Sequence, residues 1–210
     1  MPLLIFIVVG MLCLLVHEYG HAFSCRALGG GSSEVEINSM GGVTKSSYPP
    51  ATRRGHLLMV LAGPGASLFM AVLVGVVLSL YTGVAPLKGV VYAFIAPLPF
   101  DPPRELLEWC YIPIWSQIRA LDMSPFAITC YHTLFFVSVW WSIFNLLPII
   151  PMDGGKALYL CTNNIRLTGM VGFTTAILLG VWGLTQGLII TVFFCAWFVW
   201  LNWQFMRSSR

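Results

Sequence analysis

Residues 3–23 read LLIFIVVGMLCLLVHEYGHAF, and this stretch decides the class of fold. It is apolar throughout except for the segment HEYGH at residues 17–21. About 20 mostly apolar residues, rising 1.5 Å each in a helix, span the hydrocarbon core of a bilayer. The stretch lacks the basic start and small-residue cleavage site of a removable signal peptide. It therefore predicts a membrane-spanning helix that carries polar groups near one end.

The composition of the whole chain agrees with a membrane protein. Of its 210 residues, 58% are hydrophobic and 9% are charged, whereas a soluble domain has about a quarter charged residues. One soluble core of this size leaves roughly 30% of the unfolded surface exposed, too much for so apolar a chain. Disorder requires the opposite composition. A net charge of +3 without a block of like charges argues against a nucleic-acid partner.

Three further apolar runs follow the first, which covers about residues 2–28. They cover about residues 57–81, 125–150 and 167–206. The last would make a helix of roughly 60 Å, about twice the hydrocarbon thickness, so we place a break near Gly183–Gln186. The sequence thus predicts an all-α polytopic protein with about five transmembrane helices.

The segment between the second and third runs is too short to cross a bilayer. Residues 89–100 are apolar but end in a proline-rich stretch, which favours a re-entrant or interfacial piece. Trp109, Tyr111 and Trp115 follow, with charged residues interspersed, and we expect them at the level of the lipid headgroups.

The basic residues predict how the chain is oriented. With five spans, one side carries Arg26, Lys45, Arg53, Arg54, Lys156, Arg166, Arg207 and Arg210, and the other carries Lys88, Arg104 and Arg119. The side with more Lys and Arg is usually cytoplasmic. We therefore expect a multi-pass protein of the cell membrane with its N-terminus outside and its C-terminus inside.

The segment at residues 17–21 is an H-E-x-x-H motif. On a helix, His17 and His21 share a face and can bind one zinc ion, while Glu18 can reach a water molecule beside it. The alternative is a pair of histidines making ordinary hydrogen bonds at a membrane boundary. That alternative leaves unexplained an ionised group at a depth where it costs about 3 kcal/mol.

A third zinc ligand is predicted at Asp153. It belongs to NLLPIIPMDGG, residues 145–155, whose prolines and glycines cannot continue a helix. Irregular backbone at membrane depth is tolerated where protein buries it or where it lines a wet cavity. The orientation places Asp153 on the same cytoplasmic side as His21. A plain Pro-Gly turn with Asp153 in water is the alternative.

The other histidines are weaker candidates for ligands. His132 precedes Asn145 by 13 residues, about 20 Å along a helix, so we expect it to be a packing residue near the far side of the membrane. His56 lies beside Arg53 and Arg54, and we interpret it as an interfacial residue, with a ligand or gating role as the alternative.

The two motifs together resemble the site-2 protease family of intramembrane zinc metalloproteases. The segment Ala62-Gly63-Pro64 matches a third landmark of that family. The resemblance implies a three-helix metalloprotease core in residues 1–165, with a C-terminal pair of transmembrane helices in residues 166–210. Ser67 departs from the family pattern, since the family commonly has asparagine there, and Ile150 stands where many members have a proline.

The resemblance also implies a role for each site residue. His17, His21 and Asp153 would bind one zinc ion per chain, and Glu18 would be the catalytic acid/base. Asn145 would hold the substrate or stabilise the tetrahedral intermediate.

A site at membrane depth predicts a substrate that is itself a transmembrane segment. The loop Glu34–Ser47 alternates apolar residues with acids around a Gly-Gly turn, and we expect a short cytoplasmic β-hairpin that could pair with an unwound substrate. A plain loop is the alternative. Because no stretch is long and polar enough for a sensing domain, we expect prior trimming of the substrate or a regulatory membrane partner.

Two other functions remain open from the sequence. One is a membrane metal transporter, in which metal flux would survive the change Glu18→Gln. The other is a catalytically silent scaffold that binds client helices. A protease would keep its zinc after Glu18→Gln but would lose cleavage.

Overall fold

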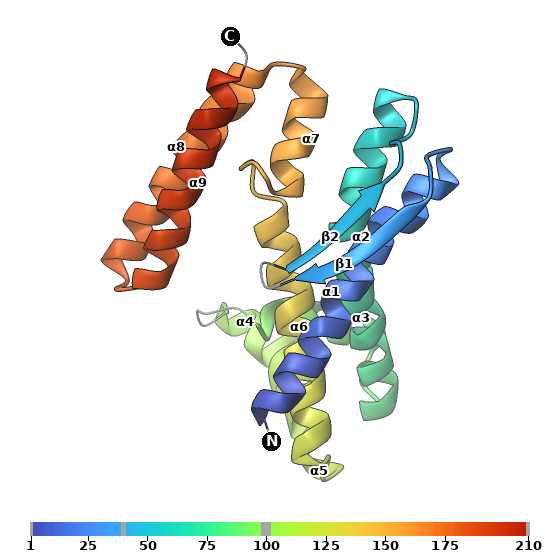
Figure 1. The fold of residues 1–210 in the computed structure, drawn as a ribbon. Helices are drawn as coiled ribbons and strands as arrows, with labels where there is room; N and C mark the ends of the chain where they lie inside the picture. The colour runs from blue at the N-terminus through green and yellow to red at the C-terminus, as the bar shows by residue number, and fades with distance from the viewer. Residues whose placement is uncertain (1, 39–40, 98–101, 209–210) are drawn as a thin grey trace. The chain divides into compact units, whose positions relative to one another are not determined.

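A computed structural model describes residues 2–38, 41–97 and 102–208 (Figure 1). The chain forms two compact units that alternate along the sequence. Unit 1 comprises residues 1–20, 34–45 and 63–142, and unit 2 comprises residues 21–33, 46–62 and 143–210. The division of function between residues 1–165 and 166–210 stays a prediction.

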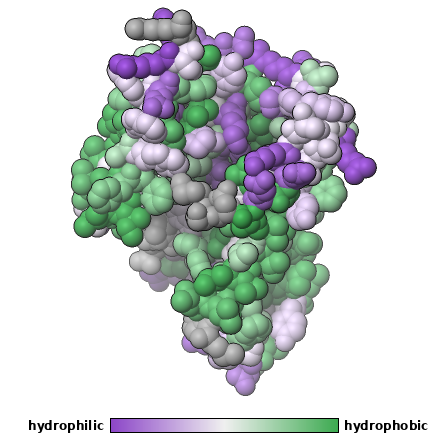
Figure 2. Space-filling view, viewed as in Figure 1, coloured by the Kyte–Doolittle hydropathy of each residue, from purple (hydrophilic) through white to green (hydrophobic). Residues whose placement is uncertain are grey.

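Five of the helices that the structure describes are long and apolar enough to cross a membrane. They are α1 (Pro2–Ala27), α2 (Arg53–Thr82), α6 (Pro125–Asn145), α8 (Ile165–Thr185) and α9 (Ile189–Arg207). Their outward faces carry apolar side chains, as lipid contact requires, and Figure 2 shows such side chains over much of the visible surface. The predicted all-α polytopic fold with about five spans is confirmed.

The break predicted in the last apolar run is also confirmed. Helix α8 ends at Thr185 and α9 begins at Ile189. Between them, Gly187 has φ +69°, a conformation that favours glycine and turns the chain back.

Two predicted boundaries differ from the structure. Helix α6 ends at Asn145, five residues before the predicted end of its span at 150. Pro148 explains this difference, because proline removes a helical hydrogen bond and restricts the residue before it. Helix α2 begins at Arg53, four residues before the predicted start.

The segment between α2 and α6 contains short helices. Helix α3 (Pro86–Ile95) occupies most of the piece predicted to be re-entrant or interfacial, whose residues 98–100 lie outside the described part of the chain. A continuous helical segment follows, made of α4 (Arg104–Leu106), the π-helical turn η1 (Leu107–Tyr111) and α5 (Ile112–Ala120). The headgroup-level placement of this segment stays a prediction.

Unit 1 has an aromatic core where α3, α5 and α6 meet. Tyr92, Ile114 and Phe135 are fully buried there. His132 lies in this core, with its Nε2 3.4 Å from the Tyr92 hydroxyl and its ring edge-on to Trp115. These contacts agree with the interpretation of His132 as a packing residue.

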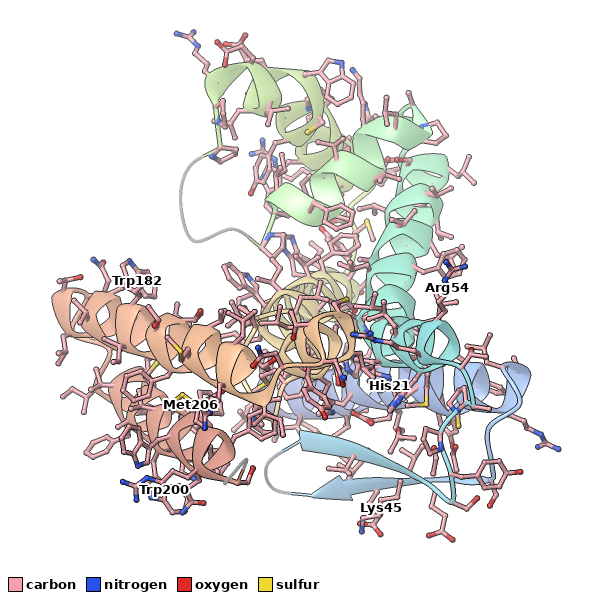
Figure 3. The ribbon with its side chains drawn as sticks, turned by 90° about the horizontal axis from the view of Figure 1, so that it is seen from above. His21, Lys45, Arg54, Trp182, Trp200 and Met206 are labelled. Atoms are coloured by element: carbon pink, nitrogen blue, oxygen red, sulfur yellow. The ribbon has the colours of Figure 1, made fainter. Side chains whose placement is uncertain are left out.

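Unit 2 contains the antiparallel pair α8–α9, which lie side by side in Figure 1. Glycines on α8 allow this close packing, since a Cβ at Gly169 would collide with Met206 and one at Gly172 would collide with the Asn202 side chain. The outer faces of the pair carry large aromatic residues such as Trp182 and Trp200, each 52% exposed (Figure 3).

The predicted hairpin is present as strands β1 (Ser33–Asn38) and β2 (Gly41–Ser46). The Ser33 and Ser46 hydroxyls lie 2.8 Å apart across it. Lys45 Nζ donates to Glu36 Oε2 at 2.6 Å, a second cross-strand contact. These two pairs of side chains add to the backbone hydrogen bonds between the strands.

Candidate metal centre

Helix α1 carries both histidines of the H-E-x-x-H motif. His17 is 1% exposed and His21 is 8% exposed. Four residues apart on an unbroken helix, the two rings share one face.

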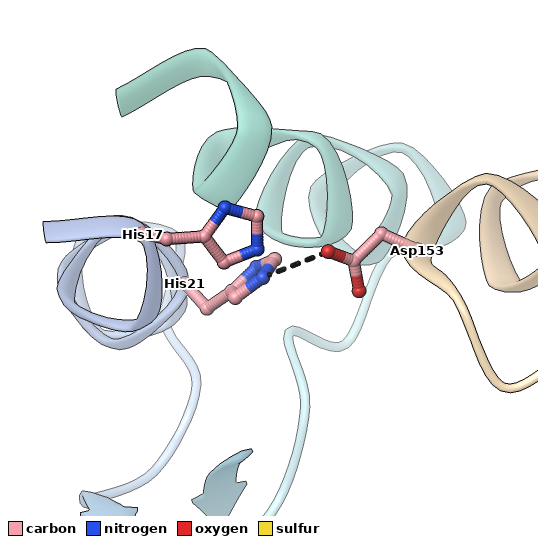
Figure 4. Close-up of side chains that lie close together, drawn as sticks. All are labelled: His17, His21 and Asp153. Atoms are coloured by element: carbon pink, nitrogen blue, oxygen red, sulfur yellow. Dashed lines mark hydrogen bonds and ion pairs between the residues drawn. The ribbon is translucent and has the colours of Figure 1, made fainter. Parts of the chain in front are cut away.

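Asp153 reaches His21 within unit 2. It is the first residue of α7 (Asp153–Thr162) and is 4% exposed. Its Oδ2 lies 3.1 Å from His21 Nε2, as the dashed line in Figure 4 marks. Its other oxygen, Oδ1, accepts a hydrogen bond of 3.0 Å from Lys156 Nζ.

The three side chains form a group that fits a zinc ion. One ligand atom from each of His17, His21 and Asp153 lies within 4.8 Å of the others, and all three residues are buried. Ligand atoms in a tetrahedral zinc site lie about 3.4 Å apart, close to the 3.1 Å between His21 and Asp153. Two imidazoles and one carboxylate are also a donor set of catalytic zinc sites, which keep a fourth position open.

A hydrogen bond at Nδ1 orients each imidazole. His21 Nδ1 donates to the backbone carbonyl of Met59 at 2.9 Å, which leaves Nε2 as the nitrogen with a lone pair. His17 Nδ1 lies 3.3 Å from the Ser67 hydroxyl, which is fully buried on α2. Such partners fix the tautomer and ring orientation of metal-binding histidines. Ser67, which departs from the family pattern, thus contacts one of the two rings.

Glu18 is buried beside the histidines and contacts the hairpin. It is 5% exposed, and its Oε2 accepts a hydrogen bond of 2.7 Å from the Thr44 hydroxyl on β2. Burial of a carboxylate is costly unless hydrogen bonds compensate for the lost water. The sequence motif placed Glu18 beside the two histidines, and the structure adds Thr44 as its partner.

Residues 5–181 match the model of Peptidase family M50. This chain belongs to that family. The predicted resemblance to site-2 proteases is thereby confirmed, and the chain is a multi-pass membrane metallopeptidase by family and architecture.

A solved structure has a similar fold. The site-2 protease from Methanocaldococcus jannaschii is similar over 96% of this chain and 77% of its own, with a TM-score of 0.55 and 19% sequence identity. No curated protein matches the chain.

The loop before Asp153 of this M50 chain is tightly packed. A Cβ at Gly154 would collide with the backbone of Leu146, and one at Gly155 would lie 2.5 Å from the Ile149 carbonyl carbon. The D-G-G sequence therefore lets the first turn of α7 lie directly against the preceding loop. This packing fixes where Asp153 begins its helix.

Asn202 on α9 holds the same loop from another side. Its Nδ2 donates to the Ile150 carbonyl at 3.0 Å, and its Oδ1 accepts from the Ile150 amide at 3.2 Å. Asn202 is fully buried. Asn202 is one of the few polar residues in this apolar span, a signal in the sequence that could have drawn attention to it but not to its partner.

Two other predicted candidates, Asn145 and His56, have defined positions in the fold. Asn145 is half-buried at the last position of α6, eight residues before Asp153. His56 is half-buried in the first turn of α2, where its amide bonds the Thr52 carbonyl. Its neighbour Arg53 donates to the Leu160 carbonyl at the end of α7.

Sequence reasoning missed Lys156, Thr44 and Met59. Lys156 lies three residues after Asp153 on a helix, a spacing that predicts contact. Thr44 and Met59 have no local signal, because each reaches its partner through long-range packing.

Proposed function

We propose that this M50 chain is a zinc-dependent endopeptidase that hydrolyses peptide bonds in transmembrane segments of other membrane proteins. His17, His21 and Asp153 would hold one zinc ion per chain, and Glu18 would be the catalytic acid/base. The buried Glu18 carboxylate, one residue from His17 on the helix that supplies two of the ligands, is the observation that carries the proposal.

In the proposed reaction, the zinc ion and the residues of the chain have separate roles. Bound zinc supplies a Lewis acid that makes water nucleophilic near neutral pH. Glu18 takes a proton from the attacking water onto its carboxylate and delivers it to the nitrogen of the leaving chain. The Asn145 amide donates a hydrogen bond to the substrate carbonyl oxygen, an interaction typically worth about 3 kcal/mol in the transition state.

The substrate class follows from the position of the motif. The H-E-x-x-H segment belongs to a helix of spanning length, so the bonds within its reach are those of membrane-embedded segments. A helical substrate hides its peptide bonds in backbone hydrogen bonds and must unwind first. An unwound segment can then add as a strand to the edge of the β1–β2 hairpin.

The proposal includes a cellular setting. The excess of Lys and Arg beside the hairpin, α7 and the C-terminus favours a cell-membrane protein with its active site toward the cytoplasm. Its partners would be membrane proteins with transmembrane segments, together with a regulatory membrane partner. Nucleic acid is not among the expected partners.

The test compares wild type with Glu18→Gln in lipid vesicles that contain single-span substrates. We expect wild type to cleave and Glu18→Gln to bind one zinc per chain without cleaving, because the amide cannot accept the proton. Glu105→Gln is the matched control, since Glu105 is exposed on α4 and should leave cleavage unchanged.

The outcomes separate the rival functions. Zinc flux into vesicles that persists in Glu18→Gln would indicate a transporter. Substrate binding without cleavage in wild type would indicate a scaffold. Equal cleavage by wild type and Glu18→Gln would refute the mechanism.

A further inference from the structure

Strand β2 lies against α1 at the position of Glu18. A Cβ placed on Gly42 would collide with Cγ of Glu18, so this glycine allows the strand to approach closely. Residues 42 and 44 point to the same face of the strand, because side chains alternate along it. Gly42 and Thr44, successive residues on one face of the strand, therefore lie next to Glu18.

Thr44 contacts Glu18 through its hydroxyl. Its Oγ1 lies 2.7 Å from the carboxylate Oε2 and 3.0 Å from the backbone carbonyl of Glu18. One hydroxyl hydrogen serves one acceptor at a time, and an ionised carboxylate is the stronger acceptor. The shorter of the two distances is also the one to the carboxylate.

The hairpin does not need this contact to form. Ser33 pairs with Ser46, and Glu36 pairs with Lys45, across the two strands. Removing the Thr44 hydroxyl therefore leaves the hairpin's cross-strand contacts in place. What it removes is the donor that fixes the direction of the Glu18 carboxylate.

We propose that Thr44 is a positioning residue for Glu18, and that its hydroxyl holds the carboxylate in the orientation in which it accepts a proton from water. This inference rests on the proposed function. It makes the hairpin part of the machinery that prepares the catalytic base, in addition to an edge for substrate. Gly42 contributes by letting the strand come close enough for the hydrogen bond.

The experiment uses the full-length zinc-loaded protein in vesicles and measures kcat, KM and zinc content. Thr44→Val keeps the shape of the side chain and removes the donor. Because the lost hydrogen bond is made to a charged group, we expect kcat to fall by about 10- to 100-fold. KM and zinc content should stay near the wild-type values.

Two further variants make the result specific. Thr44→Ser restores a hydroxyl and should recover most of kcat. Thr185→Val is the matched control, because it makes the same change at an exposed threonine of α8 whose hydroxyl donates to the Trp182 carbonyl, and it should behave as wild type. If Thr44→Val fails to accumulate in membranes, Thr44→Ala takes its place with the same expected fall in kcat.

The outcomes distinguish this inference from the proposed function. Wild-type kcat in Thr44→Val, or equal defects in Thr44→Val and Thr44→Ser, would overturn the positioning role while cleavage by wild type upholds the function. A defect confined to KM would overturn it in favour of substrate binding. A wild-type protein that cleaves nothing would overturn both.

Discussion

The two imidazoles of the metal centre are oriented by different kinds of partner. His21 bonds a backbone carbonyl at 2.9 Å, which no side-chain substitution can remove, whereas His17 lies 3.3 Å from the hydroxyl of Ser67. Partners of this kind change metal affinity because they restrict the ring and raise the basicity of the ligand. Of the two partners that orient the imidazoles, Ser67 is therefore the one that a substitution can remove.

Ser67→Ala should weaken zinc binding by about tenfold, the lower end of the range for such partners. Competition with a chelator of known affinity measures this change. Ser79→Ala is the matched control, since Ser79 is buried on the same helix, three turns away, and should keep the wild-type affinity. Equal affinities for Ser67→Ala and Ser79→Ala would contradict a role for Ser67 at the metal centre.

At the element scale, the loop between α6 and α7 fixes the third ligand. Asn202 on α9 satisfies both backbone groups of Ile150, and Gly172 on α8 leaves room for the Asn202 side chain. The α8–α9 pair therefore supports the loop that leads to Asp153. We therefore expect the position of Asp153 to depend on the packing of α8 against α9.

Asn202→Leu should destabilise unit 2 and weaken zinc binding together. The substitution leaves the Ile150 amide and carbonyl without partners, and each unsatisfied group costs about 1–3 kcal/mol. Thermal unfolding in detergent, with and without zinc, measures both effects. Gln204→Leu is the control, because Gln204 is exposed on the same helix. An unchanged midpoint and zinc affinity in Asn202→Leu would contradict the support that we assign to this residue.

The helices and the metal-binding motif could be predicted where neighbouring residues in the sequence carry the signal. Hydropathy predicted the spans, and the four-residue spacing of His17 and His21 predicted a shared helix face. Asp153 was predictable because prolines and glycines marked its loop. Thr44, Asn202 and Met59 were not predicted, because their roles depend on contacts between segments 26 to 52 residues apart. The end of α6 was placed too late because hydropathy continues past Pro148 while the helix does not.

For the whole molecule, the distribution of basic residues predicts how the chain is oriented in the membrane. We expect the loop before α2 to face the cytoplasm and the turn between α5 and α6 to face the opposite side. One added cysteine, Ala51→Cys or Asp122→Cys, reports each place in a chain whose Cys130 and Cys161 are replaced by serine and whose other four cysteines are buried. In intact cells, a membrane-impermeant maleimide should label the variant at position 122 and spare the one at position 51. The reverse pattern would contradict the orientation.

Zinc binding by His17, His21 and Asp153 is the central prediction for this protein. The decisive measurement is a crystal structure of the zinc-loaded Glu18→Gln protein, with the metal located by anomalous scattering at the zinc edge. We expect one zinc ion per chain, bonded at about 2.0–2.2 Å to one nitrogen of His17, one nitrogen of His21 and a carboxylate oxygen of Asp153. Zinc bound at other residues, or Asp153 turned away from a zinc ion that the two histidines hold, would contradict it.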